Sequence, residues 1–194
     1  MNHYLPDSLI LLNYAFKSAH IPHAFDGAIA LAYWGIPRAT RDIGVNVFLS
    51  VEHRAWVLDA VSELFPVANR EQVEQQIARS AQVRLRWQDT PVDLFFSNSE
   101  LHDAMADRAR SVVYAGTEIH VLSAEDLILC KAAFDRAKDW VDIEDVCKIQ
   151  GKRLDQRYLR RWLSEFYEPS DQQCQRIEGL LRRYVLPPGP ETHG

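Results

Sequence analysis

The chain has 194 residues, of which 47% are hydrophobic and 25% are charged, and its formal net charge is -5. This composition is typical of a soluble globular protein and excludes the disordered and fibrous classes. The length suffices for one well-buried α/β domain followed by a short helical part. The negative charge excludes a domain-wide basic field, so any contact with RNA has to be local.

Neither a membrane span nor an export signal is expected. No apolar run approaches the roughly 20 residues of a spanning helix, and the segment Met1 to Pro6 lacks the basic and apolar pattern of a signal peptide. The cysteines lie far apart and form no C-x-x-C pattern, which argues against a zinc site and a disulfide framework: Cys130, Cys147 and Cys174. We therefore expect a cytoplasmic protein with no membrane contact.

Helical and extended patterns alternate through the first part of the chain. Apolar residues at helical spacing predict helices, and short runs rich in Val, Ile and Phe predict strands. A turn at 89–91 joins two of these runs into a hairpin. The expected elements are a helix over 7–19, a strand over 23–25, a helix over 27–34, a strand over 43–49, helices over 52–65 and 72–80, strands over 83–87 and 92–96, a helix over 101–109, and strands over 112–114 and 118–121.

Only helices are expected after residue 122. Ser123 and Asp126 form a capping-box-like pair that predicts a helix start, and further helical patterns follow. Basic residues gather in this part, and a solvated helix face explains them more simply than a contact with RNA. The expected helices cover 124–134, 138–150, 155–166 and 171–184.

The pattern as a whole predicts an α/β (α+β) fold, in which helices flank a mixed sheet and a C-terminal helical bundle follows. The expected boundaries are 1–122 for the αβ domain, 123–186 for the helical region and 187–194 for a disordered tail.

The segment Asp26-Gly27-Ala28 follows an expected strand and opens an expected helix. A glycine at such a place lets the backbone approach a phosphate, and a helix N-terminus presents free N–H groups. A simple tight turn would leave the same pattern. The segment is therefore a candidate phosphate site with a structural alternative.

Two carboxylates mark expected strands. Asp42 stands directly before the strand over 43–49, and Asp93 lies inside the apolar segment Pro-Val-Asp-Leu-Phe-Phe. A carboxylate in such a strand is costly to bury unless it is paired or bound to a metal. The alternative for Asp93 is an edge strand whose aspartate faces water.

Lys131 lies on an expected helix that is apolar around it. An inward-facing lysine needs an anionic partner, and a triphosphate would serve. The alternative is a side chain that extends along the helix to solvent.

In this order the segments resemble the minimal nucleotidyltransferase fold. The resemblance is closest to the AbiEii-type nucleotidyltransferases, toxins of toxin–antitoxin and phage-defence systems, and it covers roughly residues 22–150. That family's pattern is a Gly-Gly or Gly-Ser helix opening, an Arg-x-Thr-x-Asp-hydrophobic-Asp strand and a later strand carboxylate, then a lysine helix followed by Arg-x-Lys-Asp and a further Asp. This chain reads Arg38-Ala39-Thr40-Arg41-Asp42-Ile43-Gly44 and Arg136-Ala137-Lys138-Asp139 at the corresponding places.

The resemblance implies transfer of a nucleoside monophosphate from a nucleoside triphosphate to a tRNA or protein acceptor, with an antitoxin as a further partner. It implies that Asp42 and Asp93 are catalytic and hold Mg²⁺. The residues that it implies for nucleotide binding are Gly27, Arg38, Thr40, Lys131 and Asp139.

The chain departs from the family pattern at two positions. Gly44 stands where the family has the second strand aspartate, and Asp26 stands where it has the first glycine. Gly44 removes one metal ligand, and Asp26 brings negative charge to the expected phosphate site. Either the fold survives as a catalytically inactive binding module, or Asp26 has joined the metal ligands and restores three carboxylates.

Overall fold

The computed structural model describes residues 5–64, 69–87 and 89–185. Its contacts divide the chain into two compact units: Met1–Ile29 with Ala39–Leu122, and Ala30–Arg38 with Ser123–Gly194. The helix α2, Gly27–Trp34, contributes residues to both.

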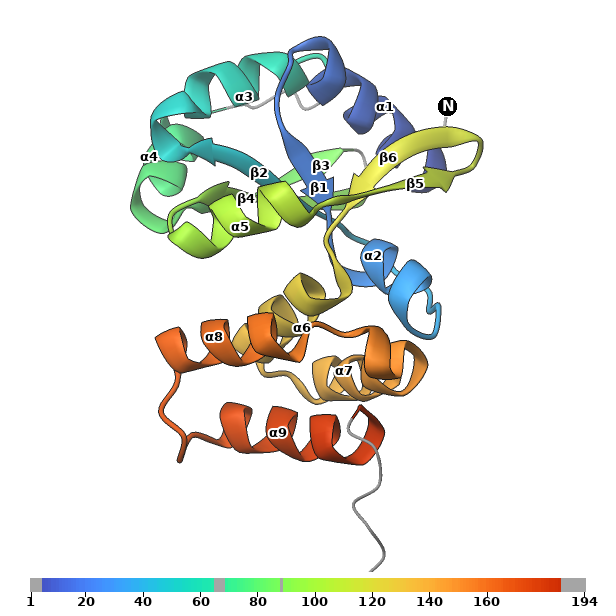
Figure 1. Ribbon diagram of the computed structural model, residues 1–194. Coiled ribbons are helices and arrows are strands. Elements are labelled where there is room, and N and C mark those ends of the chain that lie inside the picture. The colour runs from blue at the N-terminus through green and yellow to red at the C-terminus, as the bar shows by residue number, and fades with distance from the viewer. Residues whose placement is uncertain (1–4, 65–68, 88, 186–194) are drawn as a thin grey trace, which may run out of the picture. The chain divides into compact units, whose positions relative to one another are not determined.

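The first unit is built on a six-stranded mixed sheet with the strand order β3-β4-β2-β1-β6-β5 (Figure 1). The pairs β2 with β4 and β1 with β6 are parallel, and the other neighbours are antiparallel. This arrangement confirms the mixed sheet flanked by helices that the sequence predicts. The strands are β1 His23–Phe25, β2 Ile43–Ser50, β3 Gln82–Trp87, β4 Thr90–Ser97, β5 Arg110–Tyr114 and β6 Thr117–Val121.

Side chains alternate between two faces along these strands. Ile43 pairs with Val92, and Val92 pairs with Leu85, so the three apolar side chains share one face. Each is buried. The residues next to them in the chain, which include Gly44 and Asp93, therefore lie on the opposite face. That face carries most of the polar residues of the central strands.

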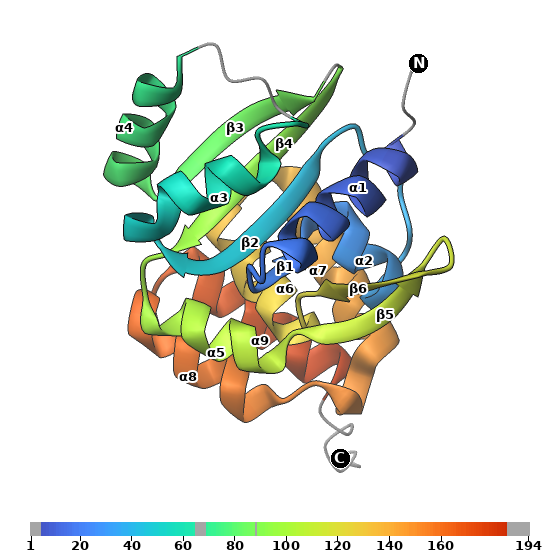
Figure 2. The same ribbon diagram turned by 90° about the horizontal axis from the view of Figure 1, so that it is seen from above.

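Helix α1, Leu5–Ser18, covers the apolar face. The ring of its Phe16 lies 4.9 Å from the ring of His23 on β1, centroid to centroid, and Asn13 Oδ1 lies 3.2 Å from His23 Nε2. Burial lowers the pKa of His23 to about 4, so the ring is neutral near pH 7. Helix α3, Arg54–Val61, packs beside α1 (Figure 2).

The segment before residue 65 differs from the expected single helix over 52–65. A short 3₁₀ turn, Val51–His53, precedes α3, and α3 ends at Val61. The hydroxyl of Ser62 donates to the carbonyl oxygen of Asp59, which competes with continuation of the backbone ladder. The remaining helices of this unit are α4 Arg70–Ser80 and α5 Glu100–Arg108, and the hairpin of β3 and β4 is formed as predicted.

The second unit contains helices and no strand among its described residues. Ser123 caps α6 by accepting the backbone N–H of Asp126 at 3.2 Å, which confirms the predicted helix start. Helix α6 packs against α7 and α8, and α7 packs against α9. The helices are α6 Ala124–Phe134, α7 Ala137–Gln150, α8 Gln156–Phe166 and α9 Gln172–Tyr184, with a 3₁₀ turn over Gly151–Arg153.

The expected tail over 187–194 lies outside the described residues. Among the residues that are described, no helix combines the length and the apolar character that crossing a membrane requires.

Candidate functional site

The polar face of the sheet brings the predicted strand carboxylates together. Gly44 on β2 pairs with Asp93 on the parallel neighbour β4. Residues that pair in this way point to the same face. Asp42 directly precedes β2, and its charge acts on Arg84, which pairs with Asp93 on that face. Asp93 on β4 and Asp42 at the start of β2 therefore lie on the same side of the sheet.

Asp26 is directed into the place that a side chain at position 44 would fill. Its backbone N–H donates to the carbonyl oxygen of Gly44 at 3.0 Å, which extends the pairing of β1 with β2 by one residue. A Cβ atom added at Gly44 would lie 2.1 Å from Asp26 Oδ1 and 3.1 Å from Asp26 Cγ. Such distances are far below van der Waals contact, so the Asp26 carboxylate and a side chain at position 44 exclude each other.

The Asp26 carboxylate is buried, with 7% of the residue exposed. Its Oδ2 accepts a hydrogen bond from Asn46 Nδ2 at 3.2 Å. Asn46 lies two residues after Gly44 and shares its face. Asp26, Asp42 and Asp93 therefore share the polar face. The departures from the family pattern at positions 26 and 44 are therefore linked, because the carboxylate at 26 fills the space that the glycine at 44 leaves.

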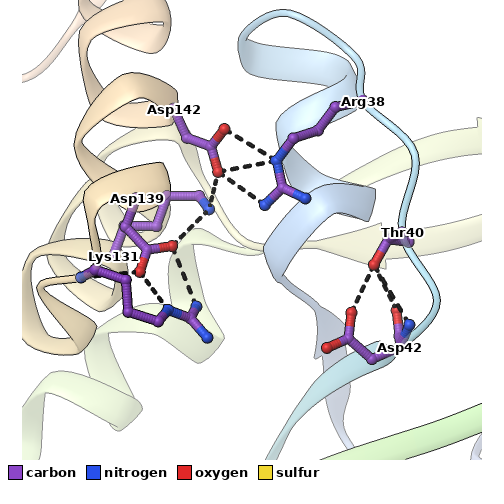
Figure 3. A network of polar contacts seen from close by, with 7 residues as sticks. Arg38, Thr40, Asp42, Lys131, Asp139 and Asp142 are labelled. Atoms are coloured by element: carbon purple, nitrogen blue, oxygen red, sulfur yellow. Dashed lines mark hydrogen bonds and ion pairs between the residues drawn. The ribbon is translucent and has the colours of Figure 1, made fainter.

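Thr40 orients Asp42. Its hydroxyl donates to Asp42 Oδ1 at 2.5 Å, and the backbone N–H of Asp42 lies 3.4 Å from the same hydroxyl oxygen (Figure 3). This turn fixes the carboxylate at the start of β2. The structure thus gives Thr40 a contact with the candidate metal ligand.

Arg84 on β3 holds Asp93. Its Nε and Nη2 donate to the two carboxylate oxygens at 2.6 and 2.7 Å, and this hydrogen bonding raises the pKa of the guanidinium. The Arg84 side chain is 63% exposed and that of Asp93 is 21% exposed. An exposed pair of this kind contributes less than about 1 kcal/mol to stability. No motif in the sequence marks Arg84, although its alternation with Val83 and Leu85 places it on this face.

Gly27 adopts a backbone φ of +58°, and an added Cβ would meet nothing within 4 Å. The position therefore needs glycine for its conformation and not for space. We expect Gly27→Ala to lower the free energy of unfolding by about 1–2 kcal/mol. Urea unfolding measures this, with Gly179→Ala on α9 as the control, because an added Cβ there also meets nothing. Equal stability of Gly27→Ala and the parent would contradict the expected strain.

In the second unit, Lys131 is buried among carboxylates (Figure 3). Its Nζ donates to Asp142 Oδ2 at 2.7 Å and lies 3.6 Å from Asp139 Oδ1. The side chain is 4% exposed, so the alternative of a lysine that extends to solvent is wrong. The lysine does face anionic partners, and in the chain itself these are the two aspartates of α7.

Two arginines complete this network. Arg38 Nε and Nη2 donate to the two oxygens of Asp142 at 3.0 and 2.9 Å. Burial opposes ionisation of Asp142, but hydrogen bonds and positive charge from Arg38 and Lys131 prevail and lower its pKa. Arg136 Nε donates to Asp139 Oδ2 at 2.6 Å, and Asp139 also caps the start of α7. Asp142, to which no sequence pattern gave a role, connects Arg38 with Lys131.

The polar face carries carboxylate side chains that could bind a metal ion. Carboxylate oxygens are what Mg²⁺ prefers. Asp26 and Asp42 would hold the ion. Both oxygens of Asp93 accept hydrogen bonds from Arg84. Over the described residues no group of three or more His, Cys, Asp or Glu side chains lies close enough together to hold a metal.

No protein-family model matches the sequence, and no curated protein does. Solved structures do match. ANT(2'')-Ia in complex with adenylyl-2''-tobramycin has a TM-score of 0.60 and 15% identity, over 84% of this chain and 98% of that chain. The lincosamide antibiotic adenylyltransferase LnuA, bound to lincomycin, has a TM-score of 0.52 and 16% identity, over 76% of this chain and 99% of that chain.

A third match is an antigenic nucleotidyltransferase-like protein from Paracoccidioides brasiliensis, with a TM-score of 0.53 and 16% identity, over 91% of this chain and 87% of that chain. At these identities the likeness concerns the fold. The chain has the nucleotidyltransferase fold, as the motif order predicts.

Proposed function

We propose that this chain is a metal-dependent nucleotidyltransferase, which transfers a nucleoside monophosphate from a nucleoside triphosphate to an acceptor hydroxyl. One observation carries the proposal. The Asp26 carboxylate occupies the place of a side chain at position 44, so the polar face keeps three carboxylates although residue 44 is glycine. A decayed site would show the loss without such a replacement. The nucleotidyltransferase fold supports the same conclusion.

Each carboxylate has a role in this proposal. Asp26 and Asp42 would hold Mg²⁺, which when bound offsets the negative charge of the triphosphate. Asp93 accepts the proton of the acceptor hydroxyl. The hydroxyl oxygen forms a bond to the α-phosphorus, the bond from that phosphorus to the pyrophosphate oxygen breaks, and pyrophosphate leaves. Thr40 acts as a positioning residue for Asp42.

Nucleotide binding by the remaining residues belongs to the same proposal. Gly27 would let the backbone approach a phosphate. Arg38 and Lys131 carry positive charge that a triphosphate attracts, and Arg38 is the more accessible of the two, with a side chain 34% exposed against 4% for Lys131. Asp139 supports the network through Lys131 and Arg136.

Two classes of acceptor are candidates. The resemblance to AbiEii-type toxins suggests tRNA or a protein in the cytoplasm, with an antitoxin as partner. The similar structures instead hold adenylyl-2''-tobramycin in one case and lincomycin in another. A panel of RNA, protein and antibiotic acceptors therefore has to be offered to the enzyme.

The test is transfer of label from each of the four α-³²P nucleoside triphosphates in the presence of Mg²⁺. We expect the parent to transfer label, and Asp26→Asn, Asp42→Asn and Asp93→Asn each to slow transfer roughly 100-fold or more. Asp107→Asn is the matched control, since Asp107 is exposed on α5. It should behave like the parent.

The second candidate function is a non-catalytic nucleotide-binding module, and the hold of Arg84 on both oxygens of Asp93 favours it. A parent that binds nucleoside triphosphate in calorimetry but transfers no label to any acceptor would establish this function. Transfer that survives Asp26→Asn unchanged would remove the role proposed for Asp26.

A further inference from the structure

Strand β3 forms one edge of the sheet (Figure 2). Its two exposed arginines form a basic row on the polar face. Its side chains alternate, with Val83, Leu85 and Trp87 buried and the others exposed. Arg84 and Arg86 thus stand two residues apart on the exposed face, about 7 Å from each other along the strand. Arg84 pairs with Asp93 in the register, so this basic row adjoins the proposed proton acceptor.

The pairing of Arg84 with Asp93 keeps the aspartate occupied. Both of its oxygens accept hydrogen bonds from one guanidinium, at 2.6 and 2.7 Å. A carboxylate in this state is poorly placed to accept a proton from an acceptor hydroxyl. The partner is well exposed, with 63% of the Arg84 side chain accessible, so an anion from solution can reach the guanidinium and compete for it.

We propose that Arg84 and Arg86 form the acceptor subsite, and that the acceptor carries a phosphate beside the hydroxyl that receives the nucleotide. This rests on the function proposed above. The acceptor phosphate binds Arg86 and takes Arg84 from Asp93, since guanidinium binds phosphate in the same forked geometry as carboxylate. Asp93, released, accepts the hydroxyl proton. The hydroxyl oxygen then bonds to the α-phosphorus as pyrophosphate departs.

Charge determines which acceptors fit. A phosphate replaces the negative charge that Arg84 loses when Asp93 is released, so the guanidinium remains paired. A cationic acceptor, such as an aminoglycoside, leaves Arg84 on Asp93 and adds positive charge beside Arg86. A phosphate occurs beside a hydroxyl in RNA and in small sugar phosphates, and this chemistry is common to both sources.

The test measures binding first, so that it is independent of transfer. Calorimetry and fluorescence anisotropy compare the full chain with an RNA oligonucleotide, ribose 5-phosphate, ribose and tobramycin. We expect at least one of the two phosphate-bearing ligands to bind and ribose not to. Arg84→Gln and Arg86→Gln should each weaken that binding about tenfold. For RNA, each should also lower the slope of log K against log salt concentration by about one, because one phosphate contact is lost. Preference between RNA and ribose 5-phosphate identifies the source.

Arg110→Gln is the matched control, because Arg110 is exposed on β5, at the opposite edge of the sheet. It should bind like the parent. The proposal is overturned if neither phosphate-bearing ligand binds. It is also overturned if the Arg84, Arg86 and Arg110 variants lose binding affinity equally.

Pyrophosphate release in the absence of acceptor gives a second readout. Arg84→Gln frees Asp93 to accept a proton from water, so we expect hydrolysis of the triphosphate to rise about tenfold over the parent, and no rise in Arg110→Gln. No change with Arg84→Gln, in a parent that transfers label, overturns the release step. Absence of label transfer from every variant would instead count against the proposed function and leave the binding result standing.

Discussion

Gly44→Asp is expected to destabilise the protein by about 3 kcal/mol, and Asp26→Gly in the same chain is expected to restore most of that loss. The single change places a side chain on the Asp26 carboxylate, since even a Cβ at position 44 would lie 2.1 Å from Asp26 Oδ1. It also places a second negative charge beside Asp26, which is only 7% exposed. The double change moves the carboxylate from the residue after β1 to position 44 on β2, so the site again holds one negative charge.

The measurement is a double-mutant cycle by urea unfolding, with label transfer measured on the same four proteins. We expect Asp26→Gly alone to fold but to transfer roughly 100-fold more slowly, because the face is left with two carboxylates. The double variant should regain transfer. Additive effects of the two changes on stability would mean that the side chains do not share one space. A double variant that is stable but inactive would mean that Asp26 contributes more than its carboxylate.

Lys131→Met is expected to destabilise the chain by about 3 kcal/mol, because it leaves Asp139 and Asp142 buried without the ammonium between them. Methionine keeps most of the side-chain volume, so the loss reports the charge and its hydrogen bond. Arg38 and Arg136 remain to hold the two aspartates, which limits the loss to the lower end of the range for a broken buried pair. Urea unfolding followed by tryptophan fluorescence measures the change.

Lys148→Met is the matched control for this prediction. Lys148 lies on α7 and pairs with Glu144 at 3.1 Å, but its side chain is 44% exposed. Substitution there should leave stability unchanged within error. If Lys131→Met keeps full stability and only raises the KM for the triphosphate, the lysine binds phosphate and the network is not a structural requirement.

Much of this molecule followed from local sequence patterns. Runs of apolar residues at a period of two or of 3.6 determined where strands and helices form, because those periods are set by backbone geometry alone. The cap of α6 at Ser123 was predictable for the same reason, since a side chain and a backbone N–H three residues away are held together by the helix itself. The order of the motifs further predicted the nucleotidyltransferase fold.

Tertiary structure decided the meaning of the residues that the patterns singled out. Asp26 and Gly44 are 18 positions apart in sequence, so they looked like two separate departures from the family pattern. Only the pairing of β1 with β2 brings the Asp26 carboxylate to the place of a side chain at position 44. Asp93 could have faced water or a metal, and the register of β3 against β4 sets Arg84 on it. The sequence predicted an anionic partner for Lys131 without identifying it, and the packing of α6 on α7 shows that this partner is Asp142. In each case the deciding partner lies on another element, at a distance that no periodicity within one segment encodes.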